Sequence, residues 1–570
     1  MASPTGTAPS STAAAVAETA DIDAVVNAAA AAAESWAAVP LLERAAMLDR
    51  LVARTDEVSG AWAQAGVRGK GLPEGSPLIS EEWMGGPWAL IAGATAYAET
   101  LRAIAGGGLP FPDSAVHERP DGQLLVDAYP TSLTERLLLQ RFHAQVWIDP
   151  AVSRNELAGT VAQLYAGDGP ADRGVCAVMG AGNIASITPL DVIYALFAEG
   201  FTVVTKLSPV NGYLQPQLEH IFGEFIDRDW VRIVQGDATI GEQLVTHPKV
   251  RAVHVTGSGA THDAIVFGSG QEAAERRAAG TSRLDKPVTA ELGGVTPVIV
   301  VPGKWSARDL RFQADHIATQ KLMNSGHNCI ATQIVVMPAD WDQAEAFTHH
   351  LEAALRRLAV RDEYYPGAES RHASMLAAAP GCEVIGRGDP ALLVAELDAT
   401  KDEPAFTIEA FGGFLGIVRL PGDTDAFLRA ATEFANDRLA GTLGASVIVD
   451  PKTAKAHAAG LDGLIAGLRY GAVCVNAWAA VAFLLPRCSW GGYPGATLTD
   501  IQSGTGIVHN AYLLGRVQKS VVTAPFRQSP TPPWFVTNKT SAVSAERISH
   551  HAADPTVGKL LGVFASALRG

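Results

Sequence analysis

The sequence predicts an α/β fold built around a parallel, doubly wound sheet. From Arg173 onwards, short apolar runs typical of buried strands alternate with longer apolar runs at helical spacing. Two of the strands end in glycine turns, at 180–182 (Gly-Ala-Gly) and 257–259 (Gly-Ser-Gly). Repeats of strand, helix and strand at this length favour parallel strands that bind ligands at their carboxyl ends.

Size and composition limit the possible classes of protein. A chain of 570 residues is long enough for several domains. With 48% hydrophobic and 18% charged residues, it is expected to bury large cores. Its apolar runs stay shorter than the ~18–20 residues of a membrane span. The net charge of −15 argues against a nucleic-acid partner, which favours a basic face.

The five cysteines include neither a CxxC pair nor the His/Cys spacing of a zinc site. This usage predicts a reducing compartment and no metal. Residues 1–20 are rich in Ala, Ser, Thr and Pro, without a basic segment ahead of an apolar core. We interpret them as a disordered tail rather than a signal peptide and expect a cytoplasmic protein.

Helices are expected first along the chain. Asp21 or Asp23 can cap a helix, and Pro40 suits the first turn of the next one. After an irregular crossing rich in glycine and proline, strands are predicted at 123–128 and 141–148. These strands precede the alternating region and suit an arm that pairs with another subunit. Further strands are predicted at 175–178, 202–206, 231–234, 252–256, 287–290, 330–337, 471–476 and 518–526.

The run 324–329, Asn-Ser-Gly-His-Asn-Cys, is the candidate functional centre of the chain. It ends in Cys329, directly before the predicted strand 330–337. A cysteine at such a junction is held rigidly and can face a cleft, where its thiolate is the reactive form. A lone cysteine is more often a packing residue. The reactive reading therefore depends on motifs elsewhere in the chain.

Two glutamates precede glycine pairs. Glu291 opens a Glu-Leu-Gly-Gly run after a predicted strand, and Glu409 opens Glu-Ala-Phe-Gly-Gly. A carboxylate in apolar surroundings is a candidate general base with a raised pKa, although a capping glutamate fits Glu291 as well. Ser258, in the glycine turn after strand 252–256, is placed to hold a phosphate at a helix start, or simply to make a turn.

Together these motifs resemble the aldehyde dehydrogenase superfamily, from about Ala28 to about Phe526. Run 324–329 resembles its nucleophile motif, and Glu291 its Glu-Leu-Gly-Gly motif, at close to the usual separation. The run 255–258 resembles its Phe-Thr-Gly-Ser motif. Further matches are Asn183 before the first helix of the alternating region, the run 206–209 (Lys-Leu-Ser-Pro) and the run 409–413.

The resemblance implies a Rossmann-type nucleotide-binding domain, an α/β catalytic domain and a β oligomerisation arm. The expected division is a tail (1–20), N-terminal helices and the NAD(P)-binding domain with arm strands near 123–150 (21–288), the catalytic domain (289–480), a return segment with an oligomerisation strand (481–528) and a C-terminal extension (529–570). That extension is expected to lie over a neighbouring molecule or to be mobile. A homodimer or homotetramer is expected.

The resemblance also implies roles for single residues. Cys329 attacks an aldehyde, Asn183 and the Cys329 N–H hold the oxyanion, and Glu291 activates the water that hydrolyses the thioester. The implied cofactor residues are Lys206, Ser208, Gly257, Ser258, Glu409 and Phe411. The implied function is oxidation of an aldehyde to a carboxylic acid with NADP or NAD.

The chain departs from the family pattern at several positions. His327 stands where glutamine is usual, and Trp490 where phenylalanine is usual. Pro209 replaces an acid that faces the adenosine ribose in family members that prefer NAD. Because this position carries no charge that would repel a 2′-phosphate, we expect NADP to be accepted and preferred. Further departures are Leu207, His262 and the run 180–182.

Two other functions compete with this one. A coenzyme A-acylating aldehyde dehydrogenase would pass the thioester to a thiol, and such enzymes typically lack the base that Glu291 supplies. A non-catalytic binding protein on the same scaffold would be expected to lose Cys329 or Glu291, and both are present. The substrate is not evident. Trp478 and the apolar residues at 483–485 hint at an apolar aldehyde, but they fit a packed core equally well.

Overall fold

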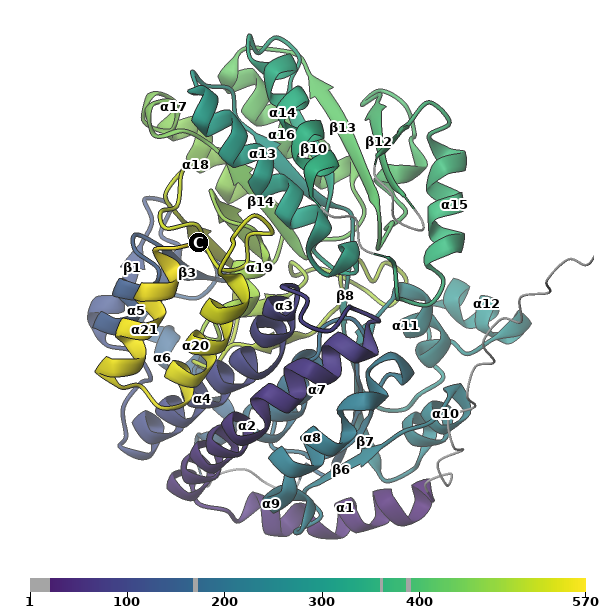
Figure 1. Ribbon diagram of the computed structural model, residues 1–570. Coiled ribbons are helices and arrows are strands. Elements are labelled where there is room, and N and C mark those ends of the chain that lie inside the picture. Colours follow the sequence, from purple (N-terminus) through teal and green to yellow (C-terminus); the bar gives the residue numbers. More distant parts are fainter. Residues whose placement is uncertain (1–20, 168–172, 359–361, 386–390) are drawn as a thin grey trace, which may run out of the picture.

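Two β-sheets of unequal size organise the chain in the computed structural model (Figure 1). The structure describes residues 21–167, 173–358, 362–385 and 391–570. The predicted tail, residues 1–20, lies outside the described residues.

The smaller sheet is parallel and has five strands in the order β6-β5-β4-β7-β8. It consists of β4 (Val175–Met179), β5 (Thr202–Lys206), β6 (Val231–Val234), β7 (Val250–Gly257) and β8 (Val288–Leu292). Each of these strands overlaps a predicted one. The domain boundary expected after residue 288 falls at the start of β8. Because β8 pairs with β7, the strand that carries Glu291 belongs to the smaller sheet.

Helices cover both faces of the smaller sheet. Val175 and Ala177 of β4 pack in the core that includes α1, whereas Cys176 and Val178 pack in the core that includes α7. Because alternate residues of a strand point to opposite faces, these two helices lie on opposite sides. The helices of this part are α1 (Ile22–Ala37), α7 (Ile187–Ile193), α8 (Gln215–Ile221), α9 (Gly223–Ile226), α10 (Ala238–Thr246), α11 (Gly259–Val266) and α12 (Gly270–Ala279).

The larger sheet has eleven strands, in the order β1-β2-β3-β18-β15-β14-β9-β10-β13-β12-β11. The part of this sheet from β15 to β11 is sandwiched between α13 and α14 on one face and α16 and α18 on the other. The strands of this part are β9 (Thr296–Val300), β10 (Thr332–Pro338), β11 (Glu383–Ile385), β12 (Leu392–Leu397), β13 (Phe414–Leu420), β14 (Gly444–Ile448) and β15 (Ala472–Val475). The helices are α13 (Ala307–Leu322), α14 (Ala344–Arg357), α15 (Ala368–Ala378), α16 (Thr424–Arg438), α17 (Pro451–Ala456), α18 (Ala458–Gly467) and α19 (Ala480–Leu484).

The arm strands complete the larger sheet within one chain. The sequence suggested that the arm strands pair with another subunit, but β3 pairs antiparallel with β18 of the same chain, and β18 also pairs parallel with β15. The arm therefore continues the larger sheet of its own chain. Its elements are β1 (Val116–Glu118), β2 (Leu124–Tyr129), α5 (Leu133–Leu138), β3 (His143–Ile148), α6 (Arg154–Thr160) and β18 (Val517–Thr523), and a separate hairpin is formed by β16 (Ser489–Gly491) and β17 (Ile507–His509).

The C-terminal extension packs on the N-terminal helices of the same chain. The helix α20 (Ser541–Ala553) contacts α2 (Leu41–Gly69), α3 (Ile79–Trp83) and α4 (Ala89–Ala105), and α21 (Val557–Ala567) packs on α20. In Figure 1 the yellow C-terminal helices lie over these purple and blue helices. The extension is thus part of this chain's own fold, whereas the sequence suggested a neighbouring molecule or a mobile segment.

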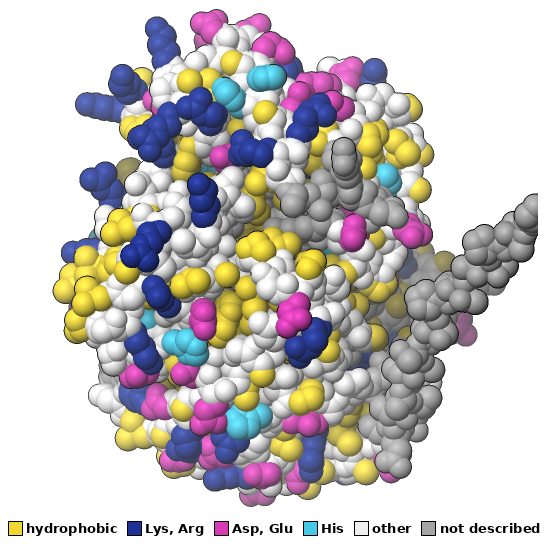
Figure 2. All heavy atoms as spheres, viewed as in Figure 1, with side chains coloured by type: hydrophobic (Ala, Val, Ile, Leu, Met, Phe, Trp, Pro, Cys, Tyr) yellow, Lys and Arg dark blue, Asp and Glu magenta, His cyan; other side chains and the backbone are white. Residues whose placement is uncertain are grey.

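Charged side chains are spread unevenly over the face shown in Figure 2. Basic side chains gather over the upper left of this face, and acidic and basic side chains mix in its lower half. Among the described residues, none of the helices combines the length and the hydropathy needed to cross a membrane.

Candidate active site

The loop that carries Cys329 has an unusual backbone. After α13, a short 3-10 turn places Asn324, Ser325 and Gly326 in succession in the left-handed region, with φ of 55°, 57° and 79°. A Cβ at Gly326 would lie 2.8 Å from the Gly412 carbonyl oxygen, so only glycine fits there. The loop ends at Cys329, a half-buried free thiol, just before β10.

The side chain and backbone of Asn324 hold this loop against three other segments. The Asn324 N–H donates to Glu81 at 2.8 Å, and its side-chain oxygen accepts from Lys70 at 2.9 Å and from Tyr364 at 3.1 Å. Its side-chain amide donates to the carbonyl of Asn183 at 3.0 Å. Such a set of bonds fixes a left-handed backbone that would otherwise be unfavourable.

Lys70 is itself held by a buried ion pair. Its ammonium group lies 2.7 Å from the Glu82 carboxylate, and both side chains are buried. Burial disfavours the cation, but Glu82 favours it, and together with two tyrosines keeps the pKa of Lys70 above its usual range. The N-terminal helices α2 and α3 therefore support the cysteine loop directly.

Asn183 lies beside the cysteine loop, as the resemblance implied. It follows β4, and its side-chain amide donates to the His327 carbonyl at 3.2 Å. The Tyr364 hydroxyl donates to the Asn183 carbonyl at 3.1 Å, which ties the two loops together. His327 in turn bonds the Phe411 carbonyl through Nδ1 at 2.9 Å, and burial lowers the pKa of this imidazole to about 4.

Glu291 is buried next to the thiol. Glu291 is only 2% exposed, and its carboxylate accepts a hydrogen bond from Trp490 Nε1 at 3.1 Å. Burial first, and Asp191 second, raise the pKa of Glu291 to about 7, although Trp490 and Cys329 oppose the shift by hydrogen bonding to it. Burial and Glu291 also raise the pKa of Cys329 well above its usual value. The resting pair is therefore a neutral thiol in contact with a base.

Four of the implied cofactor residues lie at the carboxyl edge of the smaller sheet. Lys206 ends β5, and its buried amine reaches the Leu207 carbonyl at 3.5 Å, with burial lowering its pKa. Ser208 follows, and a Cβ at Gly182 would lie 2.5 Å from its hydroxyl, so Gly182 lets two loops meet. The remaining two are Gly257, which ends β7, and Ser258, which caps α11.

Glu409 and Phe411 lie on the loop before β13, close to the Glu291 strand. A Cβ at Gly293 would lie 2.1 Å from Glu409 Oε1, so the second glutamate packs against the turn that follows Glu291. Burial, and then Glu291, raise the pKa of Glu409 to about 8. Phe411 has a left-handed backbone, with φ of 40°, and its carbonyl binds His327.

The structure thus brings Cys329, Glu291 and Asn183 together and sets Glu409 beside them. No contact links Ser258 to the thiol among the described residues. Sequence reasoning missed the supporting residues, because no motif marks them. They are Lys70, Glu81, Glu82, Tyr364, Asp191 and His254.

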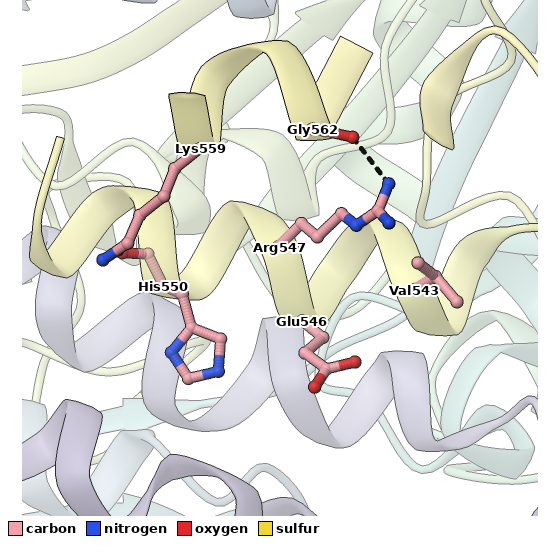
Figure 3. Close-up of a pocket in the computed structure, with 6 residues that line it drawn as sticks. All are labelled: Val543, Glu546, Arg547, His550, Lys559 and Gly562. Atoms are coloured by element: carbon pink, nitrogen blue, oxygen red, sulfur yellow. Dashed lines mark hydrogen bonds between the residues drawn. The ribbon is translucent and has the colours of Figure 1, made fainter. Parts of the chain in front are cut away.

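A separate hollow of about 430 Å³ lies on the C-terminal helices (Figure 3). Its cationic side chains are already engaged within the chain. Arg547 donates to the Gly562 carbonyl at 2.8 Å, Lys559 bonds Asp554 at 2.9 Å, and His550 lies 2.6 Å from Asp56. None of the residues that line it belongs to the cysteine loop or to the residues that contact that loop.

Comparisons with known proteins show which family the chain resembles. Residues 161–372 match the model of the aldehyde dehydrogenase family. A coniferyl aldehyde dehydrogenase from Pseudomonas sp. (strain HR199 / DSM 7063) is 25% identical over 202 residues, 35% of this chain and 37% of the relative. Aldehyde dehydrogenase LUC3 from Fusarium sp is 28% identical over 162 residues, 28% of this chain and 32% of the relative. The matches thus span about a third of these relatives.

Solved structures share the fold over most of the chain. A putative aldehyde dehydrogenase from Burkholderia cenocepacia has a TM-score of 0.57 at 20% identity, covering 88% of this chain and 91% of that one. Gamma-glutamyl-gamma-aminobutyraldehyde dehydrogenase from B. cenocepacia J2315 has a TM-score of 0.58 at 20% identity, covering 89% of each chain. A P. syringae indole-3-acetaldehyde dehydrogenase mutant in complex with NAD+ has a TM-score of 0.57 at 17% identity, covering 88% of each. The chain therefore resembles the aldehyde dehydrogenase family over residues 161–372 and shares the fold of solved aldehyde dehydrogenases.

Proposed function

We propose that this protein is an NAD(P)-dependent aldehyde dehydrogenase that oxidises an aldehyde to a carboxylic acid. The observation that carries the proposal is the convergence of Cys329, Glu291 and Asn183 from three segments of the chain. A thiol, a carboxylate in contact with it and an amide on the adjoining loop are the groups that oxidation through a thioester requires. The names of the curated relatives support an aldehyde as the substrate.

Two buried polar groups fit a nicotinamide cofactor. Glu409 Oε1 has no hydrogen-bond partner among the described residues, and a ribose hydroxyl would satisfy it. Among the described residues the Lys206 amine makes only a long hydrogen bond, so it would be available to a second hydroxyl. When bound, the cofactor supplies the hydride acceptor. The other residues proposed to hold it are Ser208, Gly257, Ser258 and Phe411.

The proposed first step is addition of the thiol to the aldehyde. Cys329 Sγ forms a bond to the carbonyl carbon while the thiol proton passes to the Glu291 carboxylate, which contacts it. The carbonyl oxygen takes the electron pair. The Asn183 amide, beside the cysteine loop, and the Cys329 N–H donate to that oxygen.

Removal of hydride from the same carbon leaves a thioester on Cys329. Glu291, again a carboxylate once the thiol proton has passed to solvent, takes a proton from water as the water oxygen attacks the thioester carbon; that second proton returns to the departing sulfur. The C–S bond then breaks, and the sulfur leaves with the electron pair. Because the pKa of Glu291 is about 7, both forms that these steps need are populated near neutral pH.

Neither competing function gains support from the site. Transfer to coenzyme A would not need a water-activating base, yet Glu291 is buried and oriented by Trp490. A binding protein would not need the thiol and the base in contact. The five cysteines are free thiols, which supports the proposed cytoplasmic location.

A panel of aldehydes tests the proposal. The full chain is incubated with each aldehyde and NAD or NADP, with and without coenzyme A. We expect reduced cofactor and free acid without coenzyme A. Reduced cofactor that appears only with coenzyme A would favour the acylating reaction, and none with any aldehyde would overturn the proposal.

A further inference from the structure

Next to Glu291 lies a buried group of polar side chains that bond to one another. Asp191 on α7 is 2% exposed, and His254 and Thr256 on β7 are 6% and 7% exposed. Thr256 Oγ1 donates to Asp191 Oδ2 at 2.9 Å, and His254 Nε2 lies 3.7 Å from the same oxygen. His254 Nδ1 bonds the Thr289 hydroxyl at 2.9 Å. The described steps of the reaction use none of these groups.

Strand register sets this network beside the base. In the parallel pair β7 and β8, His254 lies opposite Thr289, and Thr256 lies opposite Glu291. Residues two apart on a strand share a face, so all four side chains lie on one face of the sheet. Asp191 reaches that face from α7, which packs on β7. Glu291 therefore lies next to Thr256, on the same face of the sheet as the network.

Two members of the network, Asp191 and His254, shift the pKa of Glu291 in opposite directions. Burial disfavours the His254 cation, but Asp191 outweighs it with the help of Glu199 and Glu291, and the pKa of His254 is raised. Asp191 raises and His254 lowers the pKa of Glu291. A buried carboxylate that has a cationic partner keeps its charge more readily than an isolated one.

Other titratable groups face the same region from neighbouring elements. On the Glu291 side these are Cys329 and Glu409, both described above. On the Asp191 side, burial keeps His509 of β17 neutral, with its pKa lowered to about 4, and burial raises the pKa of Cys176 of β4 well above its usual value. Asp191 and His254 are thus the titratable groups of this network that act on Glu291.

We propose that Asp191 and His254 are positioning residues that set the protonation of Glu291 in opposite senses. Asp191 favours the neutral acid, His254 favours the carboxylate, and together they leave Glu291 able to take and release a proton at neutral pH. This inference rests on the proposed function, in which Glu291 is the base.

The test compares Asp191→Asn with His254→Gln, each of which removes one charge and keeps hydrogen-bonding groups. The measured quantity is the acidic limb of kcat/KM against pH, which Glu291→Gln should abolish. Removing the anion should move this limb to lower pH, and removing the cation should move it to higher pH, by about one pH unit each. The matched control Asp285→Asn, an exposed carboxylate before β8, should leave it in place.

A second measurement needs no aldehyde. The rate of alkylation of Cys329 by iodoacetamide, followed by peptide mass, should rise with ionisation of Glu291, because that carboxylate takes the thiol proton. Its inflection should shift in the same opposite directions. If the aldehyde panel fails but this profile shifts, only the proposed oxidation is lost.

Shifts in one common direction, or no shift in folded variants, would overturn the inference. If Asp191→Asn does not fold, the double variant Asp191→Asn/His254→Gln removes both charges, and its limb should return toward that of the parent. A limb that stays displaced as far as in His254→Gln would also overturn it.

Discussion

At the residue scale, the thiol of Cys329 depends on its neighbours for reactivity. Burial and the nearby carboxylates raise its pKa, so in the proposed reaction its nucleophilic form arises when Glu291 takes the proton. In that reaction one base would serve both the acylating and the hydrolytic step. His327, which the sequence singles out as a departure, supports this arrangement by binding the Phe411 carbonyl.

Replacing Cys329 with serine should abolish dehydrogenase activity. A hydroxyl is far less acidic than a thiol, and a carboxylate with a pKa of about 7 does not ionise it. The melting temperature and cofactor binding should stay close to those of the parent. Activity within tenfold of the parent would contradict the role of the thiol.

The choice of cofactor is expected to follow Pro209. This position, directly after Ser208, carries no carboxylate to accept from ribose hydroxyls or to repel a 2′-phosphate. Loss of one like-charge contact in a partly solvated cleft is worth about 1 kcal/mol, or a factor of roughly five to ten. We expect NADP to be accepted and modestly preferred in kcat/KM with one good aldehyde. A hundredfold advantage for NAD would show that Pro209 does not govern the choice.

At the element scale, α2 and α3 shape the cysteine loop. Lys70 and Glu81 reach Asn324 from these helices, and the Lys70–Glu82 pair is buried. The left-handed turn therefore depends on residues about 240 positions away along the chain.

Lys70→Met should destabilise the protein because it leaves the Glu82 carboxylate buried without its partner. Breaking one side of a buried pair costs about 3–5 kcal/mol, whereas replacing both partners with apolar residues is often close to neutral. Urea unfolding should thus show a large loss for Lys70→Met and a much smaller one for Lys70→Met/Glu82→Leu. Equal losses in the two variants would contradict the structural role of this pair.

The sequence predicts the elements of the smaller sheet well, because each strand is a short apolar run between turn signals. The strand 202–206 agrees with β5 at both ends. The strands β9, β13 and β14 were not predicted, although glycine and proline turn residues flank their apolar runs. The candidate catalytic residues were accessible through local motifs, whereas Lys70, Tyr364 and Asp191 lie far along the chain from the residues they contact, and no local pattern records these contacts.

At the scale of the whole molecule, the arm strands extend the larger sheet of their own chain, and the C-terminal extension packs on the N-terminal helices. The oligomeric state is not fixed by these contacts and stays a prediction. The connection between β2 and β3 carries α5, in which Leu133 is 71% exposed. Exposed apolar groups on an arm are typical of association surfaces.

Light scattering at micromolar concentration should therefore report two or four chains per particle. Leu133→Asp, which places a charge on the exposed face of α5, should lower the mass, whereas Leu376→Asp on α15 serves as an exposed control away from the arm. A monomeric mass for the parent protein would rule out the predicted oligomer.

The central claim is that Cys329 carries the acyl group and Glu291 activates the water that releases it. The most direct measurement mixes Glu291→Gln with an aldehyde and cofactor and follows both reduced cofactor and the intact mass of the protein. We expect an initial release of reduced cofactor of about one equivalent, slow turnover afterwards, and a mass increase of one acyl group that maps to Cys329. Steady turnover at the parent rate with no acyl adduct would contradict the account.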